Sequence, residues 1–229
     1  MSSFLEVVIL VEGQTEQKFI NDVLAPYMAV KGIYMTPIII SKKGQKGGDV
    51  KFQRVKTDIC NHLKQRNNTI ISTFVDYYGL SEWPDKDKIK VHDTPEQIAN
   101  TLNSAARKAI VAACENKNVT RRFIPFMAVH EFEALLFSDS EILSSYLSVD
   151  KSEVDKVIEE CGSPEKINNS PQTAPSKRLE RWAHGRYGKT TSGIVIAKAI
   201  GIDKMRRKCP LFNSWLFKLE SLVKNSNTI

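Results

Sequence analysis

Acidic residues follow three apolar stretches of the sequence, at the point where each stretch ends. They are Glu12 after residues 4–11, Asp76 after residues 69–75, and Glu131 and Glu133 after residues 122–129. Carboxylates that gather in one place repel one another unless a cation lies between them, and ligand sets made only of oxygen suit Mg²⁺ or Mn²⁺ better than zinc. The pattern therefore indicates a divalent-metal site, provided that the three segments meet.

Buried strands alternating with helices would bring these segments together. Strands are expected at residues 4–11, 34–40, 69–75 and 122–129, and helices from Thr15 to about residue 32, over 50–66 and over 95–117. This alternation predicts an α/β fold with a parallel, doubly wound sheet, in which the carboxyl ends of the strands share one edge. Pro37 and Pro125 argue against central positions for two of the strands, because proline cannot donate to the hydrogen-bond ladder.

The strand signal stops near residue 138. Two short helices are expected within 139–161 and further helices within 190–224. We therefore expect an α/β core over residues 1–138 and a helical, basic part over residues 139–229 that packs on it.

The net charge of +7 is unevenly distributed. Residues 166–229 contain thirteen Lys and Arg but three acids, whereas residues 1–165 have a net charge of −3. A cationic surface favours a polyanion such as nucleic acid, and it can equally be a solvated surface that keeps the protein in solution.

Each acid also has a simpler interpretation. Glu12 can favour the dipole of the following helix, Glu16 can lie on the solvated face of that helix, and Asp76 can open a turn. At a spacing of four residues, Glu12 and Glu16 can instead act as a pair. Glu131 and Glu133 would point in roughly opposite directions in a regular helix, so we expect at most one of them to be a ligand and the other to lie on the surface.

Other features carry less information. The four cysteines lack metal-binding spacing, and we expect reduced, mostly buried thiols. The loop at residues 41–49, SKKGQKGGD, either cradles phosphate or is solvated. His130 and His184 are more typical of structural or exposed histidines than of ligands. No apolar run is long enough for a membrane span and no secretion signal is present, so we expect a cytoplasmic protein without membrane contact.

The motifs resemble those of a known family. VEGQTE follows the first expected strand, FVDYYG the third and HEFEALLFSD the fourth, and APSKRLERW, GRYGKTTSG and CPLFNSWLFKLESL come later in the chain. Together they resemble the Toprim-like proteins of a bacterial family catalogued as a domain of unknown function and often encoded beside ABC-type or SMC-like ATPases. Toprim is the metal-binding fold shared by topoisomerases, primases and OLD-type nucleases. The resemblance covers nearly the whole chain.

The resemblance implies roles for the acids near the first and third strands. Glu12 is similar to the Toprim glutamate, a metal ligand and catalytic residue, and Glu16 to an additional acid of OLD-type nucleases. Asp76 is similar to the first aspartate of the Toprim DxD motif. Tyr78 stands at the second position of that motif and cannot replace a carboxylate ligand. Either one metal ion suffices, or Glu131 or Asp85 substitutes.

The later motifs imply the remaining site residues. HEFEALL resembles the motif that supplies a further acidic ligand, with Glu133 the preferred match and Glu131 the second. Lys189, in YGKTTSG, is similar to a lysine that assists the transition state in OLD-type enzymes.

The implied function is a Mg²⁺- or Mn²⁺-dependent nuclease that cleaves DNA or RNA in antiphage defence, under the control of an ABC- or SMC-like ATPase partner. The residues expected to hold the nucleic-acid backbone are Lys177, Arg178, Arg181, Arg186, Arg206 and Arg207. The alternative is a catalytically degenerate subunit that binds the ATPase or nucleic acid without cutting. The oligomeric state, including a possible oligomer, stays open.

Overall fold

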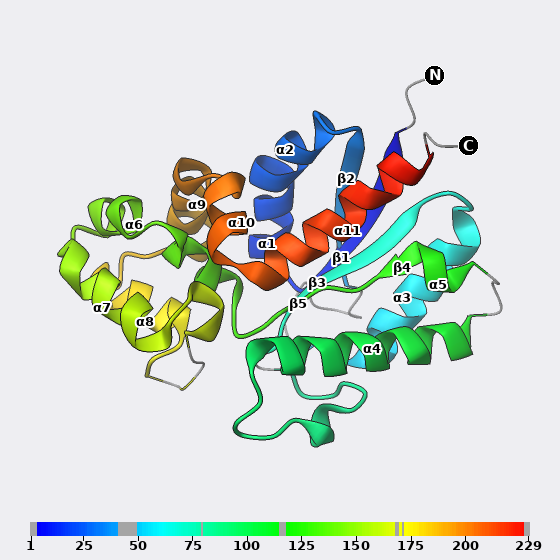
Figure 1. Ribbon diagram of the computed structural model, residues 1–229, viewed down its shortest axis with the longest axis horizontal. Helices are drawn as coiled ribbons and strands as arrows, with labels where there is room; N and C mark the ends of the chain where they lie inside the picture. The colour runs from blue at the N-terminus through cyan, green and yellow to red at the C-terminus, as the bar shows by residue number, and fades with distance from the viewer. Residues whose placement is uncertain are drawn as a thin grey trace.

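The computed structural model has a parallel β-sheet covered by helices on both faces (Figure 1). It describes residues 4–40, 50–78, 80–114, 118–167, 170 and 172–226. The strands are β1 (Leu5–Val11), β2 (Ile33–Ile39), β3 (Ile70–Asp76), β4 (Phe123–Ile124) and β5 (Met127–Ala128). Their order is β2-β1-β3-β4, β5 also pairs with β3, and every pairing is parallel. The predicted parallel α/β sheet is confirmed.

The two prolines lie where the hydrogen-bond ladder tolerates them. Pro37 lies in β2, which is at one end of the strand order. Pro125 separates β4 from β5, so the strand expected over residues 122–129 is two short strands that pair with successive parts of β3. A residue without an N–H group interrupts this strand instead of occupying its centre.

Alternate side chains of the interior strand β1 lie in two hydrophobic cores, one on each face of the sheet. Val7, Ile9 and Val11 belong to one core, and Val8 and Leu10 belong to the other. Because both faces of β1 are buried, its sequence is apolar at nearly every position, as is typical of parallel sheets.

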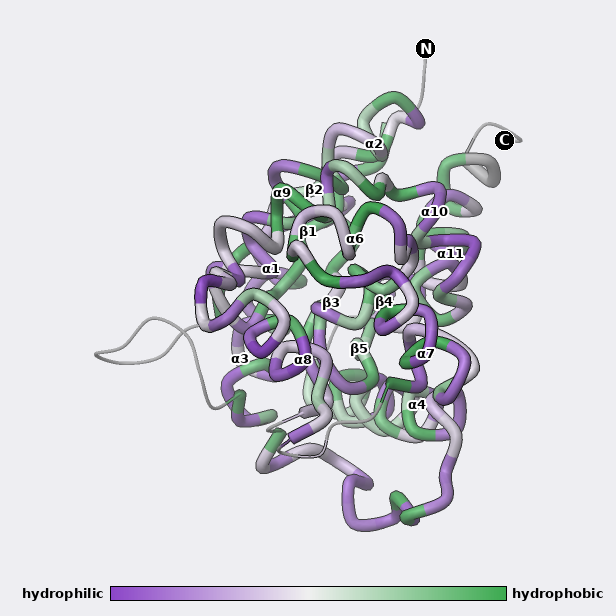
Figure 2. The backbone as a smooth tube through the Cα atoms, turned by 90° about the vertical axis from the view of Figure 1, so that its left-hand side faces the viewer, coloured by the Kyte–Doolittle hydropathy of each residue, from purple (hydrophilic) through white to green (hydrophobic). Residues whose placement is uncertain are grey.

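Helices from the first half of the chain cover both faces of the sheet. Between β1 and β2 lie α1 (Gln14–Phe19), a π-helical segment (Ile20–Leu24) and α2 (Ala25–Ala29); later come α3 (Phe52–Gln65), α4 (Pro95–Ala113) and α5 (Val119–Arg122). Figure 1 shows α3 and α4 on one side of the sheet and α1 and α2 on the other. The segment between β3 and α4 extends from the bottom of the molecule and is mostly hydrophilic (Figure 2).

The first helix begins earlier than the sequence suggested. We expected Thr15 as its N-cap, but the N-cap is Gly13, whose N–H donates to Glu16 Oε2 at 2.9 Å. The carboxylate of Glu16 thus closes the first turn from inside the helix, so that no hydroxyl side chain is needed at the cap.

The C-terminal part is helical in the region that the structure describes. It follows the 3₁₀ helix Phe132–Ser138, and it contains α6 (Ser140–Leu147), α7 (Lys151–Cys161), the 3₁₀ turn Pro164–Lys166, α8 (Pro175–Trp182), the π-helical turn Lys189–Gly193, α9 (Ile194–Ile200), α10 (Ile202–Lys208) and α11 (Pro210–Ser226). Phe212, Trp215 and Leu216 of α11 share one core with residues of β1 and α1.

The expectation of reduced cysteines is wrong for two of the four. Cys60 of α3 and Cys114, at the end of α4, form a disulfide, although 54 residues separate them. They meet because both helices pack on the same face of the sheet, which spacing in the sequence does not reveal. Cys161 and Cys209 are free.

Two further expectations concern the loop at residues 41–49 and membrane-spanning helices. The glycine- and lysine-rich loop at residues 41–49 lies outside the described residues. Among the residues that are described, no helix combines the length and the apolar character that crossing a bilayer requires.

Candidate functional site

Lys189 lies beside two buried carboxylates at the carboxyl end of the sheet. Its Nζ is 3.1 Å from Glu133 Oε1 and 3.9 Å from Glu131 Oε1. Glu131 precedes the 3₁₀ helix Phe132–Ser138 and Glu133 lies in its first turn, just after β5. The two glutamates are 5% and 1% exposed. Their position makes Lys189 the nearest compensating charge for both.

Glu133 and Lys189 shift each other's pKa values. Burial raises the pKa of Glu133 to about 7; Lys189 acts in the opposite direction, and Glu131 raises the pKa further. Burial lowers the pKa of Lys189, but the negative charges of Glu133, Glu131 and Asp76 outweigh burial and raise it to about 12. Lys189 therefore stays positive near neutral pH, where Glu133 exchanges its proton.

Ser176 fixes the orientation of Glu131. Its backbone N–H donates to Glu131 Oε2 and its Oγ donates to Glu131 Oε1, both at 2.8 Å. Ser176 is the second residue of α8, so Glu131 lies at the positive end of that helix. This explains how a glutamate that is 5% exposed is held in place.

Asp76 is the last residue of β3, and its Oδ1 is buried. In the described part of the chain, no hydrogen-bond donor reaches that oxygen. Burial holds the pKa of Asp76 well above its usual value, and the charges of Glu16, Glu133, Glu12 and Glu131 add to the shift. A buried acceptor without a partner destabilises the fold, so Asp76 contributes an unfavourable term to the cluster.

Glu12 and Glu16 bring the first strand into the same cluster. Glu12 comes directly after β1 and is half-buried, whereas Glu16 is 7% exposed. Burial raises the pKa of Glu16, and the charge of Glu12 raises it further, while hydrogen bonding to the Gly13 N–H and the charge of Lys189 lower it. The simpler interpretation of Glu16, a position on the solvated face of the helix, is wrong because its side chain is buried.

The five acids are thus electrostatically coupled around one lysine. Among the described residues, however, no three His, Cys, Asp or Glu side chains are arranged as a set that could hold a metal ion. Protein donors hold three of the carboxylates: the N–H of Gly13 binds Glu16, Ser176 binds Glu131, and Lys189 pairs with Glu133. Chemically, the arrangement is a concentrated negative charge beside one permanent positive charge.

The chain matches a known family over most of its length. The sequence profile described as "Domain of unknown function (DUF4276)" matches residues 11–220. The chain belongs to this family. No curated protein is significantly similar to it in sequence.

Two solved structures are similar to this DUF4276 chain at low sequence identity. The C-terminal region of the Burkholderia pseudomallei OLD protein is 14% identical with a TM-score of 0.47, covering 95% of this chain and 98% of that one. The C-terminal region of the Xanthomonas campestris pv. campestris OLD protein is 16% identical with a TM-score of 0.44, covering 97% and 98% of the two chains.

One expectation about the acids of this DUF4276 protein is wrong. Glu131 and Glu133 do not point in opposite directions, and neither lies on the surface. The expectation assumed a regular α-helix, but the backbone at Glu131 is extended and the helix that follows is 3₁₀. The extended residue turns its side chain to the same lysine that Glu133 reaches.

The residues proposed to replace the second DxD acid are placed differently from one another. Tyr78 is 37% exposed, and its N–H donates to the carbonyl of His130 at 3.0 Å. Asp85 forms an ion pair with Lys88 at 3.0 Å. Glu131 is the one of these alternatives whose charge acts on Asp76.

The basic residues expected to hold nucleic acid fall into two groups. Three lie on α8, directly beyond Ser176: Lys177 pairs with Glu180, and Arg178 and Arg181 donate to the backbone carbonyls of Thr173 and Gln172. Arg186 and Arg207 are exposed.

Arg206 differs from the other five. Its guanidinium binds both carboxylate oxygens of Glu220, at 2.5 and 2.9 Å, and also Asn213 and Tyr27. It joins α10 to α11 and α2, so we leave it out of the nucleic-acid surface.

The structure adds three residues that the motifs did not single out. Besides Ser176, Tyr187 has a buried hydroxyl without a hydrogen-bond partner among the described residues, and burial followed by the charges of Glu133 and Glu131 raises its pKa. His130 adopts a left-handed backbone with φ of 82°, and burial lowers its pKa to about 4. Tyr187 could have been found from its spacing of two residues from Lys189, whereas Ser176 left no signal of its own. His130 was visible in HEFEALLFSD, where its type alone favoured a structural or exposed position.

Proposed function

We propose that this DUF4276 protein is a metal-dependent phosphodiesterase that cleaves DNA or RNA. The observation that carries the proposal is the excess of buried negative charge at the carboxyl end of the sheet. Four carboxylates interact there with Lys189, the charge of Glu12 acts on two of them, and Asp76 Oδ1 has no donor within the described residues. Like charges held this closely need a cation or bound protons.

The donor chemistry fits Mg²⁺ or Mn²⁺. All the candidate ligands are carboxylates, which are preferred by hard divalent cations, and no thiol or neutral imidazole belongs to the proposed set. We propose Glu12, Glu16, Asp76 and Glu133 as the ligands, with Glu131 as an alternative. The raised pKa values of Glu16, Asp76 and Glu133 support this, because a divalent cation would replace the protons that these groups otherwise retain.

The protein's own residues would position the phosphodiester. Lys189 stays charged near neutral pH, and its Nζ would balance the negative charge that accumulates on the phosphorus oxygens during cleavage. The cations of α8, with Arg186 and Arg207, would hold the backbone of the nucleic acid without reading its sequence. A bound divalent cation would supply an activated water and stabilise the leaving oxygen.

The biological setting extends the proposal. On the sequence resemblance we propose a role in antiphage defence, in which an ABC- or SMC-like ATPase restrains or triggers the nuclease. Co-expression of this chain with any ABC- or SMC-like ATPase encoded beside it, followed by co-purification, tests the partnership. Separate elution of the two proteins would contradict it.

Metal binding and cleavage can be measured separately. Manganese binding is followed by electron paramagnetic resonance, and cleavage of plasmid, single-stranded DNA and tRNA is followed with Mg²⁺ or Mn²⁺, with and without the ATPase. We expect Asp76→Asn and Glu133→Gln to lose both manganese binding and nucleic-acid cleavage. Glu159→Gln is the matched control, since Glu159 is exposed on α7. If the wild type binds no manganese, or cuts equally well without Asp76, the proposal fails.

A binding subunit that does not cut is the second candidate. Two observations favour it: Tyr78 occupies the second DxD position, and the described side chains form no ready set of three metal ligands. In that case Lys189 alone would compensate the acids. The result that selects this candidate is nucleic-acid or ATPase binding that is insensitive to Asp76→Asn, with no cleavage in any condition.

A further inference from the structure

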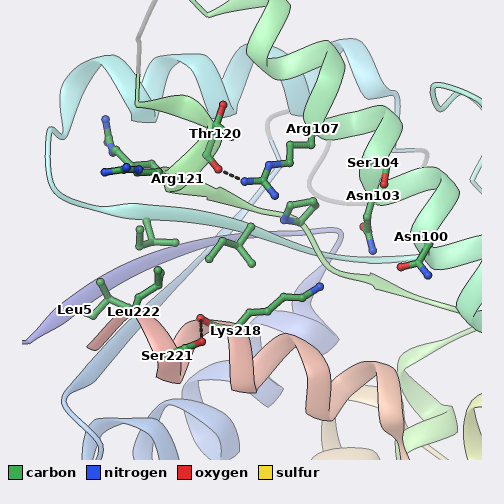
Figure 3. Close-up of a pocket in the computed structure, with 14 residues that line it drawn as sticks. Leu5, Asn100, Asn103, Ser104, Arg107, Thr120, Arg121, Lys218, Ser221 and Leu222 are labelled. Atoms are coloured by element: carbon green, nitrogen blue, oxygen red, sulfur yellow. Dashed lines mark hydrogen bonds between the residues drawn. The ribbon is translucent and has the colours of Figure 1, made fainter. Parts of the chain in front are cut away.

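A second surface feature lies at the other end of the sheet. A groove of about 840 Å³ runs between α4 and α11, over the edge of the sheet at β4 (Figure 3). Leu5 and Ile70, the first residues of β1 and β3, line it, whereas the carboxylate cluster follows the last residues of these strands. Seven residues of strand separate the two ends by about 20 Å. The groove is therefore distinct from the candidate site.

The groove is positively charged. Arg107, Arg121 and Lys218 line it and are exposed, and none of the described residues that line it is acidic. None of the three takes part in an ion pair with another described residue. Arg122 also lines the groove, but its guanidinium is occupied by backbone carbonyls, including those of Thr69 and Leu63. Arg107 also donates to the backbone carbonyl of Thr120, and its other N–H groups, together with Arg121 and Lys218, are available to an anionic partner.

One wall of the groove presents side-chain amides in a row. Asn100, Asn103, Ser104 and Arg107 are spaced as residues of one face of α4, and Figure 3 shows the two asparagines reaching from α4 into the groove. Asn103 Oδ1 is buried, and no donor of the described chain binds it. A side-chain amide offers one acceptor and two donors, the complement of a peptide group in an extended chain.

The floor of the groove is aliphatic. Leu5, Ile124, Pro125 and Leu222 contribute to it, and the part of the chain that the structure describes places no aromatic side chain in the lining. Single-stranded nucleic acids are usually held by aromatic side chains on which the bases stack, and that element is missing here. An aliphatic floor instead suits the side chains of a peptide.

We propose that this groove binds an extended, acidic peptide segment of a partner protein. Aliphatic side chains of the segment contact the floor, its backbone pairs with Asn100 and Asn103, and its carboxylates lie near Arg107, Arg121 and Lys218. Charge complementarity selects an acidic segment over a neutral one, and the row of amides selects an extended backbone over a free anion.

The test is fluorescence anisotropy with the full chain and a synthetic probe. The probe is a fluorescein-labelled peptide of alternating Leu and Asp, about nine residues and roughly 30 Å long when extended. Matched probes contain Lys in place of Asp, or Asp at every position, and a single-stranded DNA of similar length tests the competing polyanion. The variants are Lys218→Glu, Asn103→Leu and, as a charge-matched control outside the groove, Lys64→Glu on exposed α3 surface. Thermal unfolding confirms that each variant is folded.

The expected result is binding of the Leu/Asp peptide with a Kd below about 1 mM, weakened at least about tenfold by Lys218→Glu and by Asn103→Leu and unchanged by Lys64→Glu. The peptide with Lys should not bind. The proposal is overturned if the Leu/Asp peptide does not bind, if it binds all variants equally, or if the all-Asp peptide or the DNA binds as tightly with the same dependence on Lys218. All of these outcomes are measured as peptide binding and do not depend on nuclease activity.

Discussion

Replacement of Glu133 by Gln tests whether the carboxylate cluster holds more negative charge than the fold tolerates. Glu133 is 1% exposed, and its pKa is raised from 4.5 to about 7. Because the folded state binds this proton more tightly than the unfolded state does, the group's stabilising contribution is fully present below pH 4.5. That contribution is lost progressively as the pH rises through about 7.

The size of the effect follows from the same shift. A difference of about 2.5 pKa units at 1.36 kcal/mol per unit corresponds to about 3 kcal/mol of unfolding free energy. Glutamine cannot lose a proton, so the unfolding free energy of the variant does not decrease with pH for this reason. The unfolding free energy of Glu133→Gln, relative to that of the wild type, should therefore increase by about 3 kcal/mol between acidic and mildly alkaline pH.

Urea unfolding followed by circular dichroism, in EDTA and between about pH 4 and about pH 8, measures this difference. Glu159→Gln, on the exposed face of α7, should show a difference that does not change with pH. Adding Mn²⁺ at the alkaline end should stabilise the wild type more than Glu133→Gln. If the difference in unfolding free energy between Glu133→Gln and the wild type does not change with pH, burial and the neighbouring charges do not destabilise the ionised carboxylate, and the reasoning is refuted.

Three further substitutions test individual contacts. Ser176→Ala removes the 2.8 Å hydroxyl donor to the carboxylate of Glu131 and should lower the unfolding free energy by about 1.5–3 kcal/mol; a loss below about 0.5 kcal/mol would contradict the positioning of Glu131 by this serine. Gly193→Ala places a Cβ 2.6 Å from Tyr187 Oη, so urea unfolding should show a loss of about 1–3 kcal/mol that Tyr187→Phe relieves in the double variant. Cys60→Ser opens a disulfide loop of 54 residues and should lower the unfolding free energy by about 2–4 kcal/mol, with the same loss in wild type under reductant.

The fold was readable from sequence where burial controls residue type. β1 and β3 are buried on both faces, so their apolar runs marked them nearly to the residue. The acids at the strand ends were readable for a related reason: parallel strands end at one edge, so residues distant in sequence meet there.

Contacts that depend on irregular backbone or on how helices pack could not be predicted from the sequence. The extended conformation of Glu131 decides that it faces Lys189, yet no pattern in HEFEALL distinguishes it from a residue of a regular helix. Its partner Ser176 comes from 45 residues away. The pairing of Cys60 with Cys114 likewise depends on how two helices pack, since a spacing of 54 residues is compatible with many distances.

The position of α11 has a consequence for the newly made chain on the ribosome. Trp215 of α11 stacks on Phe126 at 4.6 Å and donates to Ser72 of β3, 143 residues earlier. At roughly 5–20 residues per second, Ser72 of β3 is synthesised about 7–30 s before its covering tryptophan is made. During this interval one apolar face of the sheet lacks its cover, which makes the nascent chain a candidate for chaperone binding until translation reaches α11.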